Sequence, residues 1–304
     1  MDFQRLAVFR AVARRLSFSR AADELHLTQP AVTKHIQQLE AELGVRLFHR
    51  AGKRVELTDA GRIVTDYAQR VSALTEDVRR VLGELKGLRR GYLRLGASAT
   101  PGLYLLPEIL AQFRKKYPQV ETTLVITNSA DVTRRVSAGE FDMGFVGAPT
   151  ETPGLQVRPF VGDEIVLIVP PGHPLARQRA FAPALLAQET LIVREPGSAT
   201  RQIAEANLAQ LEVVPKTVLE MTGCEGVKRA VSAGLGVAFV SRYAITLEVA
   251  QKVVGVPEIP ELRFARQLSL ITRKDARPSA AILAFLALMG KGTGVAHHKS
   301  VISS

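Results

Sequence analysis

The sequence has few of the features that mark disulfide-bonded, secreted or membrane-spanning proteins. It contains one cysteine, Cys224, in 304 residues, so no disulfide can form within the chain, which fits a reducing compartment. No run of 18 or more apolar residues occurs, so we expect no helix that crosses a membrane. Charged residues interrupt the first segment, MDFQRLAVFRAVARR, before a signal-peptide core can form. We therefore expect the protein to stay in the cytoplasm.

Motifs of the common enzyme classes are also missing. The sequence has no G-x-S-x-G nucleophile elbow, and GKGTG at 290–294 lacks the spacing of a phosphate-binding loop. GLGVAF at 234–239 lacks the third glycine of a dinucleotide-binding fingerprint. The six histidines show no zinc-site spacing, either with Cys224 or with one another. We therefore predict that the protein is not an enzyme, uses no cofactor and holds no metal ion.

The composition is that of a folded protein with a basic N-terminal part. Hydrophobic residues make up 46% and charged residues 23% of the chain, which is typical of globular proteins with sizeable cores. A length of 304 residues indicates two or three domains. Residues 1–90 hold 17 Lys and Arg against 11 Asp and Glu, a net charge of +6, and the remaining 214 residues hold 23 against 18, a net charge of +5. The N-terminal part is about three times as basic per residue, which favours an anionic partner such as nucleic acid.

Residues 1–58 show the pattern of a helix-turn-helix. Apolar residues recur at helical spacing in the first segment, and Ser17-Phe18-Ser19 supplies a break and an N-cap for the second. His26-Leu27 lies where the chain must reverse within a few residues, and His tolerates a left-handed backbone better than most residues. Thr28 then caps a third helix, and Gly44 ends it.

The third helix presents two different faces. Its inward apolar stripe is formed by Val32, Ile36, Leu39 and Leu43. Polar residues that can bond to base edges lie on the other side, and VRLFHRAGKRVEL (45–57) predicts a basic β-hairpin wing with its tip at Ala51-Gly52. An amphipathic helical hairpin with a solvated face is the alternative. We predict DNA contacts from Thr28, Gln29, Pro30, Thr33, Lys34, Gln37, Arg50, Lys53 and Arg54.

A long amphipathic helix is predicted over residues 59–87, opened by Thr58-Asp59. Its apolar residues are spaced alternately by four and three, which is a heptad seam held for more than three repeats. A rise of about 1.5 Å per residue makes this helix roughly 43 Å long. Packing on its own domain is the alternative to pairing with a second helix. We predict dimerisation through Val64, Tyr67, Val71, Leu74, Val78, Val81 and Leu85.

From Gly91 onward the pattern changes to alternating strands and helices. Apolar strands such as YLRLGAS, EIVLIVP and LSLIT are separated by helical stretches, including residues 102–117 and 130–138. This alternation over about 200 residues predicts an α/β domain with two lobes. We place the domain at 88–290, with lobe 1 at about 91–161 plus 266–290 and lobe 2 at about 162–265. Residues 291–304, with Gly, Ser and a His pair, are expected to be a flexible tail.

Three polar loops follow strands of this domain. They are Ser98-Ala99-Thr100-Pro101, Thr127-Asn128-Ser129 and REPGSATRQ at 194–202, with Thr222-Gly223 as a weaker fourth. Loops at the carboxyl ends of strands meet at the crevice between lobes, where helix N-termini point inward. Their donors favour an anionic ligand, to which Arg194 or Arg201 adds a charge-assisted contact. The alternative is that each Ser and Thr only caps a helix.

The loop residues lead to two expectations. We predict that a small-molecule effector, an anion of unknown identity, binds at Ser98, Ala99, Thr100, Asn128, Ser129, Gly197, Ser198, Thr200, Arg201 and Thr222. Cys224 lies beside these loops, where a lone thiol fits either a redox sensor or a small packing residue.

Residues from about Leu6 to Gly61 strongly resemble the N-terminal signature of LysR-type transcriptional regulators. The resemblance includes the Ala-Ala pair, Thr-Gln-Pro-Ala-Val, Leu-Gly-x-x-Leu-Phe-x-Arg and Leu-Thr-x-x-Gly. It implies a winged helix-turn-helix, a linker helix for dimerisation, an effector domain like periplasmic solute-binding proteins and a tetrameric assembly. REPGS-x-TR also resembles the subset of these regulators that governs carbon fixation and sulfur assimilation.

The sequence as a whole predicts a DNA-binding transcriptional regulator. Two copies pair through residues 59–87 and set two recognition helices in successive major grooves of an imperfect palindrome. The resemblance implies that a ligand between the lobes changes their relative angle, the tetramer and the DNA bend. RNA polymerase is a further candidate partner, and no membrane contact is expected. The alternative is a solute-binding or enzymatic α/β protein whose N-terminal helices serve oligomerisation alone.

Overall fold

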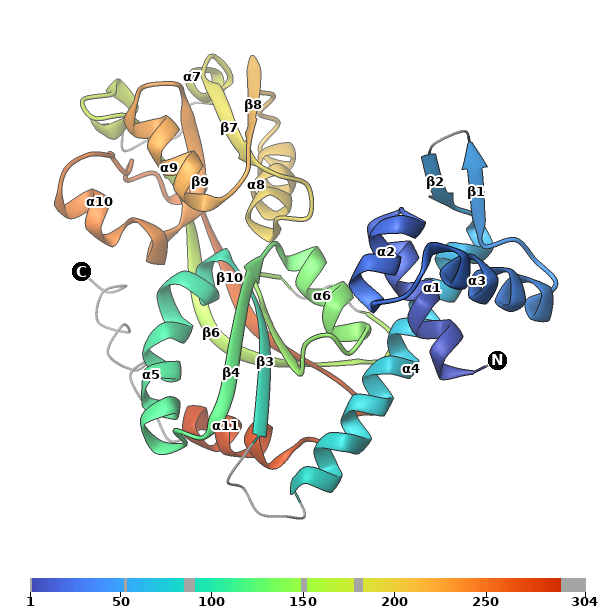
Figure 1. The fold of residues 1–304 in the computed structure, drawn as a ribbon. Helices are drawn as coiled ribbons and strands as arrows, with labels where there is room; N and C mark the ends of the chain where they lie inside the picture. The colour runs from blue at the N-terminus through green and yellow to red at the C-terminus, as the bar shows by residue number, and fades with distance from the viewer. Residues whose placement is uncertain (1, 52–53, 85–90, 149–151, 178–182, 291–304) are drawn as a thin grey trace. The chain divides into compact units, whose positions relative to one another are not determined.

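The computed structural model describes residues 2–51, 54–84, 91–148, 152–177 and 183–290. They form two compact units (Figure 1): one comprises residues 2–82 together with Ala138–Glu140, and the other comprises the rest of the described residues. The first unit is helical with a two-stranded sheet, and the second contains an eight-stranded sheet and its helices. The predicted fold class, a winged helix-turn-helix followed by a two-lobed α/β domain, is confirmed. Among the described residues no helix is both long and apolar enough to cross a membrane.

The first unit contains four helices and a hairpin within its described residues. They are α1 (Phe3–Arg15), α2 (Phe18–Leu25), α3 (Gln29–Leu43), β1 (Phe48–Ala51), β2 (Arg54–Leu57) and α4 (Asp59–Glu84). Local chemistry sets the ends of these helices. The hydroxyl of Ser17 accepts from the Arg20 N–H to begin α2, and that of Thr28 accepts from the Ala31 N–H to begin α3. His26 and Gly44 end α2 and α3 in the left-handed conformation, as predicted.

Three aromatic rings hold the core of the first unit together. Phe48 from β1 lies 5.4 Å from Phe9 and 5.7 Å from Phe18, measured between ring centroids. Val32, Ile36 and Leu39 of α3 are also buried in this core. Leu43, predicted to share that stripe, is 37% exposed because it is the last residue of α3, and that part of the prediction is wrong.

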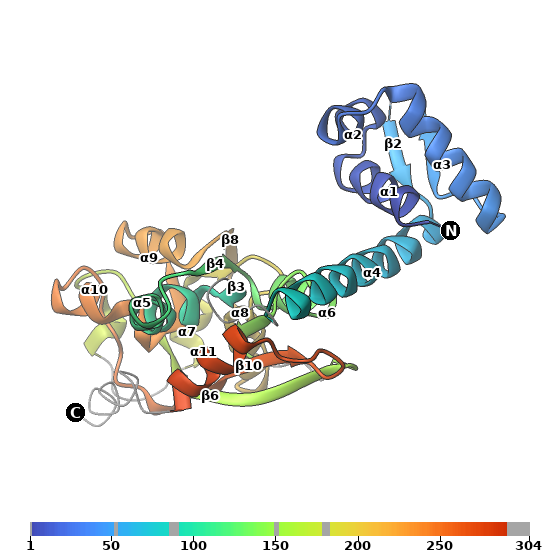
Figure 2. The ribbon, with the colours of Figure 1, turned by 60° about the horizontal axis from the view of Figure 1, so that its bottom comes forward.

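The start of α4 is attached closely to the wing. The Thr58 hydroxyl donates to the Arg46 carbonyl (2.7 Å) and accepts from the Gly61 N–H (2.9 Å). A Cβ on Gly61 would lie 2.1 Å from the Leu47 carbonyl oxygen, so only glycine fits here. Figure 2 shows α4 as one uninterrupted helix with α1, α2, α3 and β2 grouped at its N-terminal end.

The second unit alternates strands and helices. Its strands are β3 (Gly91–Ser98), β4 (Val120–Thr127), β5 (Met143–Val146), β6 (Leu155–Ile168), β7 (Thr190–Arg194), β8 (Thr217–Met221), β9 (Val237–Ser241) and β10 (Arg263–Arg273). Its α-helices are α5 (Leu106–Lys116), α6 (Ser129–Ser137), α7 (Pro183–Ala187), α8 (Ala199–Gln210), α9 (Cys224–Ser232), α10 (Thr246–Ala250) and α11 (Ala280–Gly290). Short turns are the π-helix η1 (Pro101–Leu105) and the 3₁₀ helices η2 (Pro174–Arg177), η3 (Arg242–Ile245) and η4 (Pro260–Leu262).

The sheet order explains the two lobes. The strands lie in the order β4-β3-β5-β10-β6-β9-β7-β8. Pairs that involve β6 or β10 are antiparallel, and all other pairs in this sheet are parallel. In Figure 1 the long strands β6 and β10 run from one lobe into the other. They pair along their length, with a register shift between Leu268 and Ser269.

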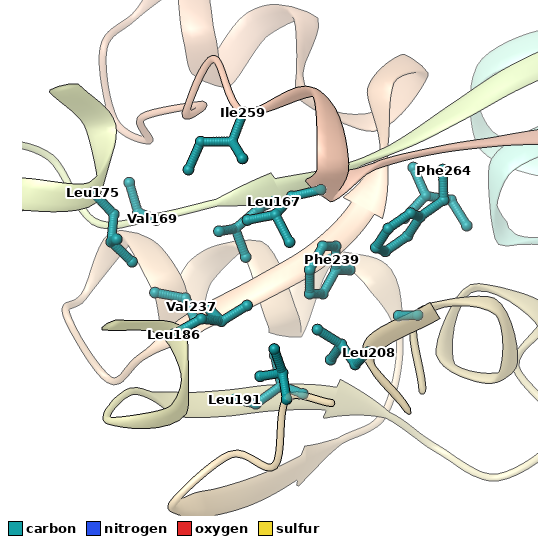
Figure 3. Close-up of a cluster of buried hydrophobic side chains, with 14 of the residues drawn as sticks. Leu167, Val169, Leu175, Leu186, Leu191, Leu208, Val237, Phe239, Ile259 and Phe264 are labelled. Carbon is teal, nitrogen blue, oxygen red and sulfur yellow. The ribbon is translucent and has the colours of Figure 1, made fainter. Parts of the chain in front are cut away.

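Each lobe has its own apolar core. In lobe 2, Leu167, Leu191 and Phe239 belong to a cluster that α8 closes with Leu208 (Figure 3). In lobe 1, Phe113 of α5 packs edge-on against Phe285 of α11, with the ring centroids 5.2 Å apart. The two cores are separate clusters, so β6 and β10 form the backbone connection between two bodies that are packed independently.

Candidate functional sites

The outer face of α3 carries exposed hydrogen-bonding groups. Gln29, Lys34 and Gln37 are exposed, and Gln29 Nε2 donates to Thr33 Oγ1 at 3.2 Å. This bond uses the Gln29 amide nitrogen and holds the side chain along the first turns of the helix. The amide oxygen takes no part in it. Thr28 differs from the others because its hydroxyl caps α3. Pro30, also exposed, stands in the first turn, where its missing N–H costs no helical bond.

The predicted wing is an antiparallel hairpin. Arg50 pairs with Val55, and Ala51 pairs with Arg54. The backbone therefore places both arginines near the same end of the hairpin as the turn. Lys53 lies outside the described residues.

A buried carboxylate anchors this wing, and sequence reasoning missed it. Glu40 of α3 accepts hydrogen bonds at Oε1 from the N–H groups of Leu47 (2.7 Å) and Phe48 (3.3 Å). Glu40 is only 9% exposed, and Arg46 lies 3.6 Å from its other oxygen. The first strand of the wing is thus hydrogen-bonded directly to α3. The only sign of this contact in the sequence was an acidic residue, Glu40, near the end of a helix in an otherwise basic unit.

The predicted seam on α4 divides into two parts. Val64 and Val71 pack against the core of the first unit, together with buried Ala68. Tyr67, Leu74 and Val78 are instead 63%, 55% and 58% exposed. Ile63, which was not in the predicted seam, is 59% exposed. Of the remaining seam positions, Val81 lies in α4 with no described side chain, and Leu85 lies outside the described residues.

The polar loops of the second unit converge on one pocket between the lobes. The residues that line it are Ser98, Ala99, Thr100, Asn128, Ser129, Gly147, Arg194, Ser198, Ala199, Thr200 and Arg266. Seven of the ten predicted effector residues are among them. The other three, Gly197, Arg201 and Thr222, do not line it. The free volume is about 10 Å³, which is room for one water molecule.

Arg266 lines this pocket and was not predicted. It is paired across β10 and β6 with Asp163, and its Nε donates to Asp163 Oδ2 at 2.7 Å. Both side chains are buried, Arg266 being 4% and Asp163 0% exposed. The same guanidinium donates to Thr100 Oγ1 of lobe 1 and to Thr200 Oγ1 of lobe 2, each at 3.0 Å. The only sign of this ion pair in the sequence was one charged residue at each position, Asp163 and Arg266, in segments far apart along the chain.

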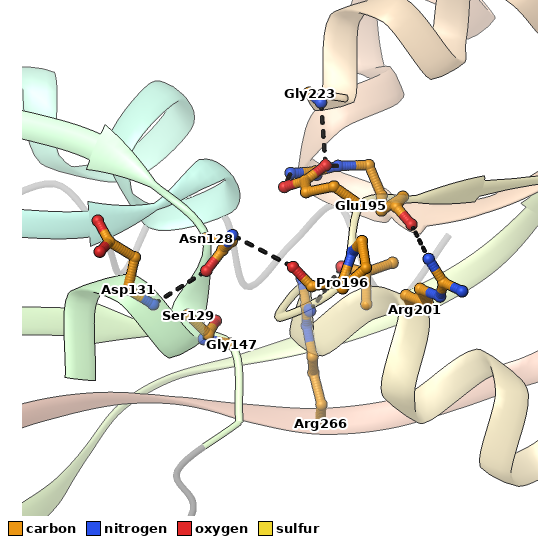
Figure 4. Close-up of polar contacts among 11 residues, drawn as sticks. Asn128, Ser129, Asp131, Gly147, Glu195, Pro196, Arg201, Gly223 and Arg266 are labelled. Atoms are coloured by element: carbon orange, nitrogen blue, oxygen red, sulfur yellow. Dashed lines mark hydrogen bonds and ion pairs between the residues drawn. The ribbon is translucent and has the colours of Figure 1, made fainter. Parts of the chain in front are cut away.

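Asn128 and Gly197 bind one another's loops across the lobes. Asn128 Oδ1 accepts from the Asp131 N–H (2.9 Å) and so caps α6, while its Nδ2 donates to the Pro196 carbonyl (3.3 Å), as Figure 4 shows. The Ala130 N–H donates to the Gly197 carbonyl at 3.2 Å. Gly197 has φ +87°, and a Cβ there would lie 2.9 Å from Asn128 Oδ1. The N-terminus of α6 is therefore used to join the lobes in this conformation.

Arg194 and Arg201, which the sequence indicated as contacts for an anionic ligand, are paired with carboxylates of the protein. Arg194 bonds to both oxygens of Glu195, at 2.8 and 2.7 Å. Burial alone would raise the pKa of Glu195, but Arg194 and the Gly223 N–H (3.1 Å) outweigh it and hold that pKa below its usual value. Arg201 bonds to the carboxylates of Glu205 and Glu220, and its Nη1 also donates to the Arg194 carbonyl at 2.8 Å (Figure 4).

Cys224 lies in a second polar cluster beside the pocket. Tyr104 of η1 donates to Glu225 Oε1 across the lobes at 2.8 Å, and Lys228 Nζ lies 2.7 Å from the same oxygen. Lys228 is buried and also bonds to Glu248 at 2.5 Å. Burial raises the pKa of the Cys224 thiol, so the reactive thiolate is disfavoured. This environment favours the packing role over the redox role.

No group of three or more His, Cys, Asp or Glu side chains suited to a metal ion occurs in the part of the chain that the structure describes. The buried polar groups of the pocket instead offer hydroxyl and N–H donors. That donor set suits a ligand rich in acceptor oxygens.

The N-terminal and the C-terminal parts of the chain each match a family model. Residues 3–62 match the bacterial regulatory helix-turn-helix proteins of the lysR family, and residues 86–293 match the LysR substrate binding domain. The RuBisCO operon transcriptional regulator of Allochromatium vinosum is 37% identical over 285 residues, covering 94% of each protein. The transcriptional activator CmpR of Synechocystis sp. is 32% identical over 279 residues, covering 92% of this chain and 91% of CmpR.

Solved structures share the fold. The regulatory domain of Synechocystis CcmR, solved in complex with 2-PG, has a TM-score of 0.63 at 29% identity and covers 67% of this chain and 99% of that domain. Full-length CbnR with its target DNA has a TM-score of 0.66 at 23% identity, covering 96% and 99%. These matches rule against the alternative of a solute-binding or enzymatic protein with helices for oligomerisation alone. The chain belongs to the LysR family of bacterial transcriptional regulators, whose DNA binding is modulated by a small effector.

Proposed function

We propose that this regulator binds an imperfect palindrome as a dimer and senses a small anionic metabolite between its lobes. Residues 1–58 form the DNA-binding domain, 59–87 the dimerising linker and 88–290 the effector domain. Two dimers associate into a tetramer, and the promoter-bound protein contacts RNA polymerase. The observation that carries the effector part is the convergence of hydroxyl groups from both lobes on the buried Arg266.

The size of the pocket supports a lobe movement on binding. Its free volume of about 10 Å³ is too small for a metabolite. The bonds from Asn128 to Pro196 and from Ala130 to Gly197 are what a larger ligand must break. Effector binding in this proposal therefore breaks these two loop contacts and replaces them with contacts to the ligand, while Arg266 stays bonded to Thr100 and Thr200.

Two relatives guide the choice of ligand. CcmR was solved with 2-PG, and the Allochromatium protein regulates the RuBisCO operon. A phosphorylated metabolite of carbon fixation is therefore the first candidate. Sulfate and thiosulfate follow, because the loop around Gly197 resembles both the carbon-fixation and the sulfur-assimilation subsets.

A thermal-shift screen of the full-length protein tests the effector. The panel contains 2-PG, phosphorylated sugars, sulfate, sulfite, thiosulfate, NADPH and small carboxylates. A ligand that binds only the native state raises the melting temperature in a saturable way. That rise should disappear in Ser98→Ala and persist in Ser72→Ala on α4. A saturable rise that survives Ser98→Ala would place the ligand elsewhere, and no rise with any compound would reject an anion of these classes.

A gel shift tests the DNA part. The proposal predicts specific binding to a palindromic duplex and a steep loss of affinity as salt rises, since released counterions drive phosphate contacts. Adding the ligand found in the screen should change the mobility or affinity of the complex. Equal affinity for palindromic and random duplexes would contradict the proposed base contacts.

A further inference from the structure

Three hydroxyl groups in the pocket already accept a hydrogen bond from a fixed N–H group. Thr100 Oγ1 and Thr200 Oγ1 accept from the two Nη atoms of Arg266, each at 3.0 Å. Ser129 Oγ accepts from the Gly147 N–H at 3.2 Å. Thr100 and Ser129 are each 6% exposed. The three residues come from both lobes, and all line the same pocket.

A hydroxyl that accepts in this way is directed to donate elsewhere. Its oxygen has two lone pairs and one hydrogen, and the N–H donor holds one lone pair. The hydrogen then points away from that donor, and since all three residues line the same pocket, it is available to a ligand bound there. Arg266 thus imposes the same donor role on one threonine of each lobe.

The charge of Arg266 is matched inside the protein. Asp163 binds its Nε at 2.7 Å and its Nη2 at 2.6 Å. The other Asp163 oxygen accepts from the Ser241 hydroxyl at 2.8 Å, which fixes the carboxylate in turn. Arg194, the other arginine of the pocket, is matched by Glu195. The pocket therefore offers oriented hydrogen-bond donors, while each of its two arginines is neutralised by a carboxylate.

The backbone at Gly147 also lies close to the Arg266 guanidinium. A Cβ on Gly147 would lie 2.9 Å from Arg266 Nη1 and 3.1 Å from the Ala199 Cβ. Only glycine at this position lets the backbone after β5 approach the guanidinium so closely. The bonds to Asp163, Thr100 and Thr200 set the direction of the two Nη donors.

We propose that Arg266 is a positioning residue that turns the pocket hydroxyls into donors and so selects an acceptor-only oxyanion. The inference rests on the proposed effector function of this pocket. The ligand class is a fully deprotonated sulfate or phosphate group, on its own or on a larger metabolite. A ligand group with its own O–H hydrogens binds less well, because a donor facing a donor makes no hydrogen bond.

The test uses sulfate and inorganic phosphate as probes, titrated calorimetrically into the full-length protein at constant ionic strength. Sulfate carries no hydrogen between about pH 6 and about pH 8, whereas phosphate loses one over this range. We expect constant sulfate affinity and phosphate affinity that rises with pH. Flat affinity for both probes, or tighter binding of the more protonated phosphate, would overturn the proposed selection.

Threonine variants test the positioning without disturbing the buried ion pair. Thr100→Val and Thr200→Val should each weaken sulfate binding about tenfold, since one hydrogen bond to a charged group is lost. Thr100→Ser should restore it, and Thr217→Val, on exposed β8, should have no effect. Equal binding by the Val and Ser variants would overturn the proposal even if Arg266 variants fail to fold.

Arg266→Lys completes the cycle. Lysine keeps the charge opposite Asp163 but cannot donate to both threonines. Its effect on sulfate affinity should vanish in the Thr100→Val/Thr200→Val background, because Arg266 acts through those hydroxyls. An equal loss in both backgrounds would mean a direct contact with the ligand and would overturn the positioning role. Wild-type protein that binds neither probe would reject the anion site itself, which is a different failure from wild-type binding with unaffected variants.

Discussion

The Tyr104 hydroxyl and the Glu225 carboxylate join the two lobes with one hydrogen bond of 2.8 Å. Tyr104 stands in η1, the π-helix that begins directly after Thr100, and Glu225 stands in the first turn of α9. Lys228 lies 3.2 Å from the same hydroxyl. π-Helical turns are rare, and many of them occur at functional sites. This one directly follows the pocket residue Thr100 and carries a lobe contact near its end.

Tyr104→Phe should favour separation of the lobes. The variant loses the hydrogen bond to Glu225 and the one from Lys228. Hydrogen bonds to charged groups contribute about 1.5–3 kcal/mol each, so the open population should rise at least about tenfold. The distance between spin labels at exposed Glu121 and Gln251 would report it. Tyr92→Phe, at a tyrosine that is 59% exposed, is the control. An unchanged distance distribution in Tyr104→Phe would mean that this bond does not hold the lobes.

Gly96→Ala should destabilise the second unit. A Cβ at this position in β3 would lie 2.2 Å from the Phe141 ring, which is buried. Overpacking of this kind costs typically about 1–3 kcal/mol, measured by urea unfolding. Gly162→Ala in β6 meets nothing within 4 Å and serves as the matched control. Equal stability of the two variants would contradict the close contact.

Leu74→Asp should weaken self-association. Leu74 is 55% exposed beside Tyr67 and Val78 on α4, and a charge in a paired apolar seam is costly to bury. Sedimentation velocity should show a shift towards monomer. Ser72→Asp places the same charge on another face of α4 and should leave the assembly intact. If both variants sediment like the wild type, α4 does not carry the dimer.

Gln29→Ala should relax sequence preference on DNA. The loss of a base-edge contact costs about 1–3 kcal/mol on the specific duplex and little on random duplex. Lys53→Ala should weaken binding to all duplexes alike and lower the salt slope by about one. Binding titrations on both duplexes at several salt concentrations separate these effects. The same loss on both duplexes for Gln29→Ala would argue against base reading.

Cys224 should react slowly with thiol reagents in the native protein. Burial raises the pKa of its thiol, so at a given pH the native state holds less thiolate than the unfolded chain. The reaction with a disulfide reagent should therefore accelerate sharply in urea. A native rate equal to that of a free thiol would restore the redox-sensor interpretation.

Local chemistry was predictable from the sequence, and long-range pairing was not. The caps at Ser17 and Thr28 and the turn at His26 depend on a few neighbouring residues, and all three hold in the structure. Spacing alone also indicated an apolar seam on α4. It could not tell that Val71 packs on its own unit while Leu74 stays exposed, because a seam has two sides and the sequence does not say which side is already covered.

The missed part of the pocket has one physical cause. Apolar patterns located the strands EIVLIVP and LSLIT, but β6 begins at Leu155 and β10 at Arg263. The unpredicted stretches contain Arg158, Asp163, Arg263 and Arg266, and charged residues are usually exposed. Asp163 and Arg266 are the exception, because each is the partner of the other across two strands distant in sequence. Only the fold brings them together.

The fit of Gly61 against the Leu47 carbonyl has a mechanical consequence. A Cβ on Gly61 would lie only 2.1 Å from the Leu47 carbonyl oxygen, so α4 packs tightly against the start of the wing. The Thr58 hydroxyl adds a hydrogen bond to the Arg46 carbonyl across the same junction. We therefore expect a twist applied along α4 to be passed on to α3 through this junction. In the proposed dimer, the distance between the two α3 helices then depends on how the two α4 helices pair.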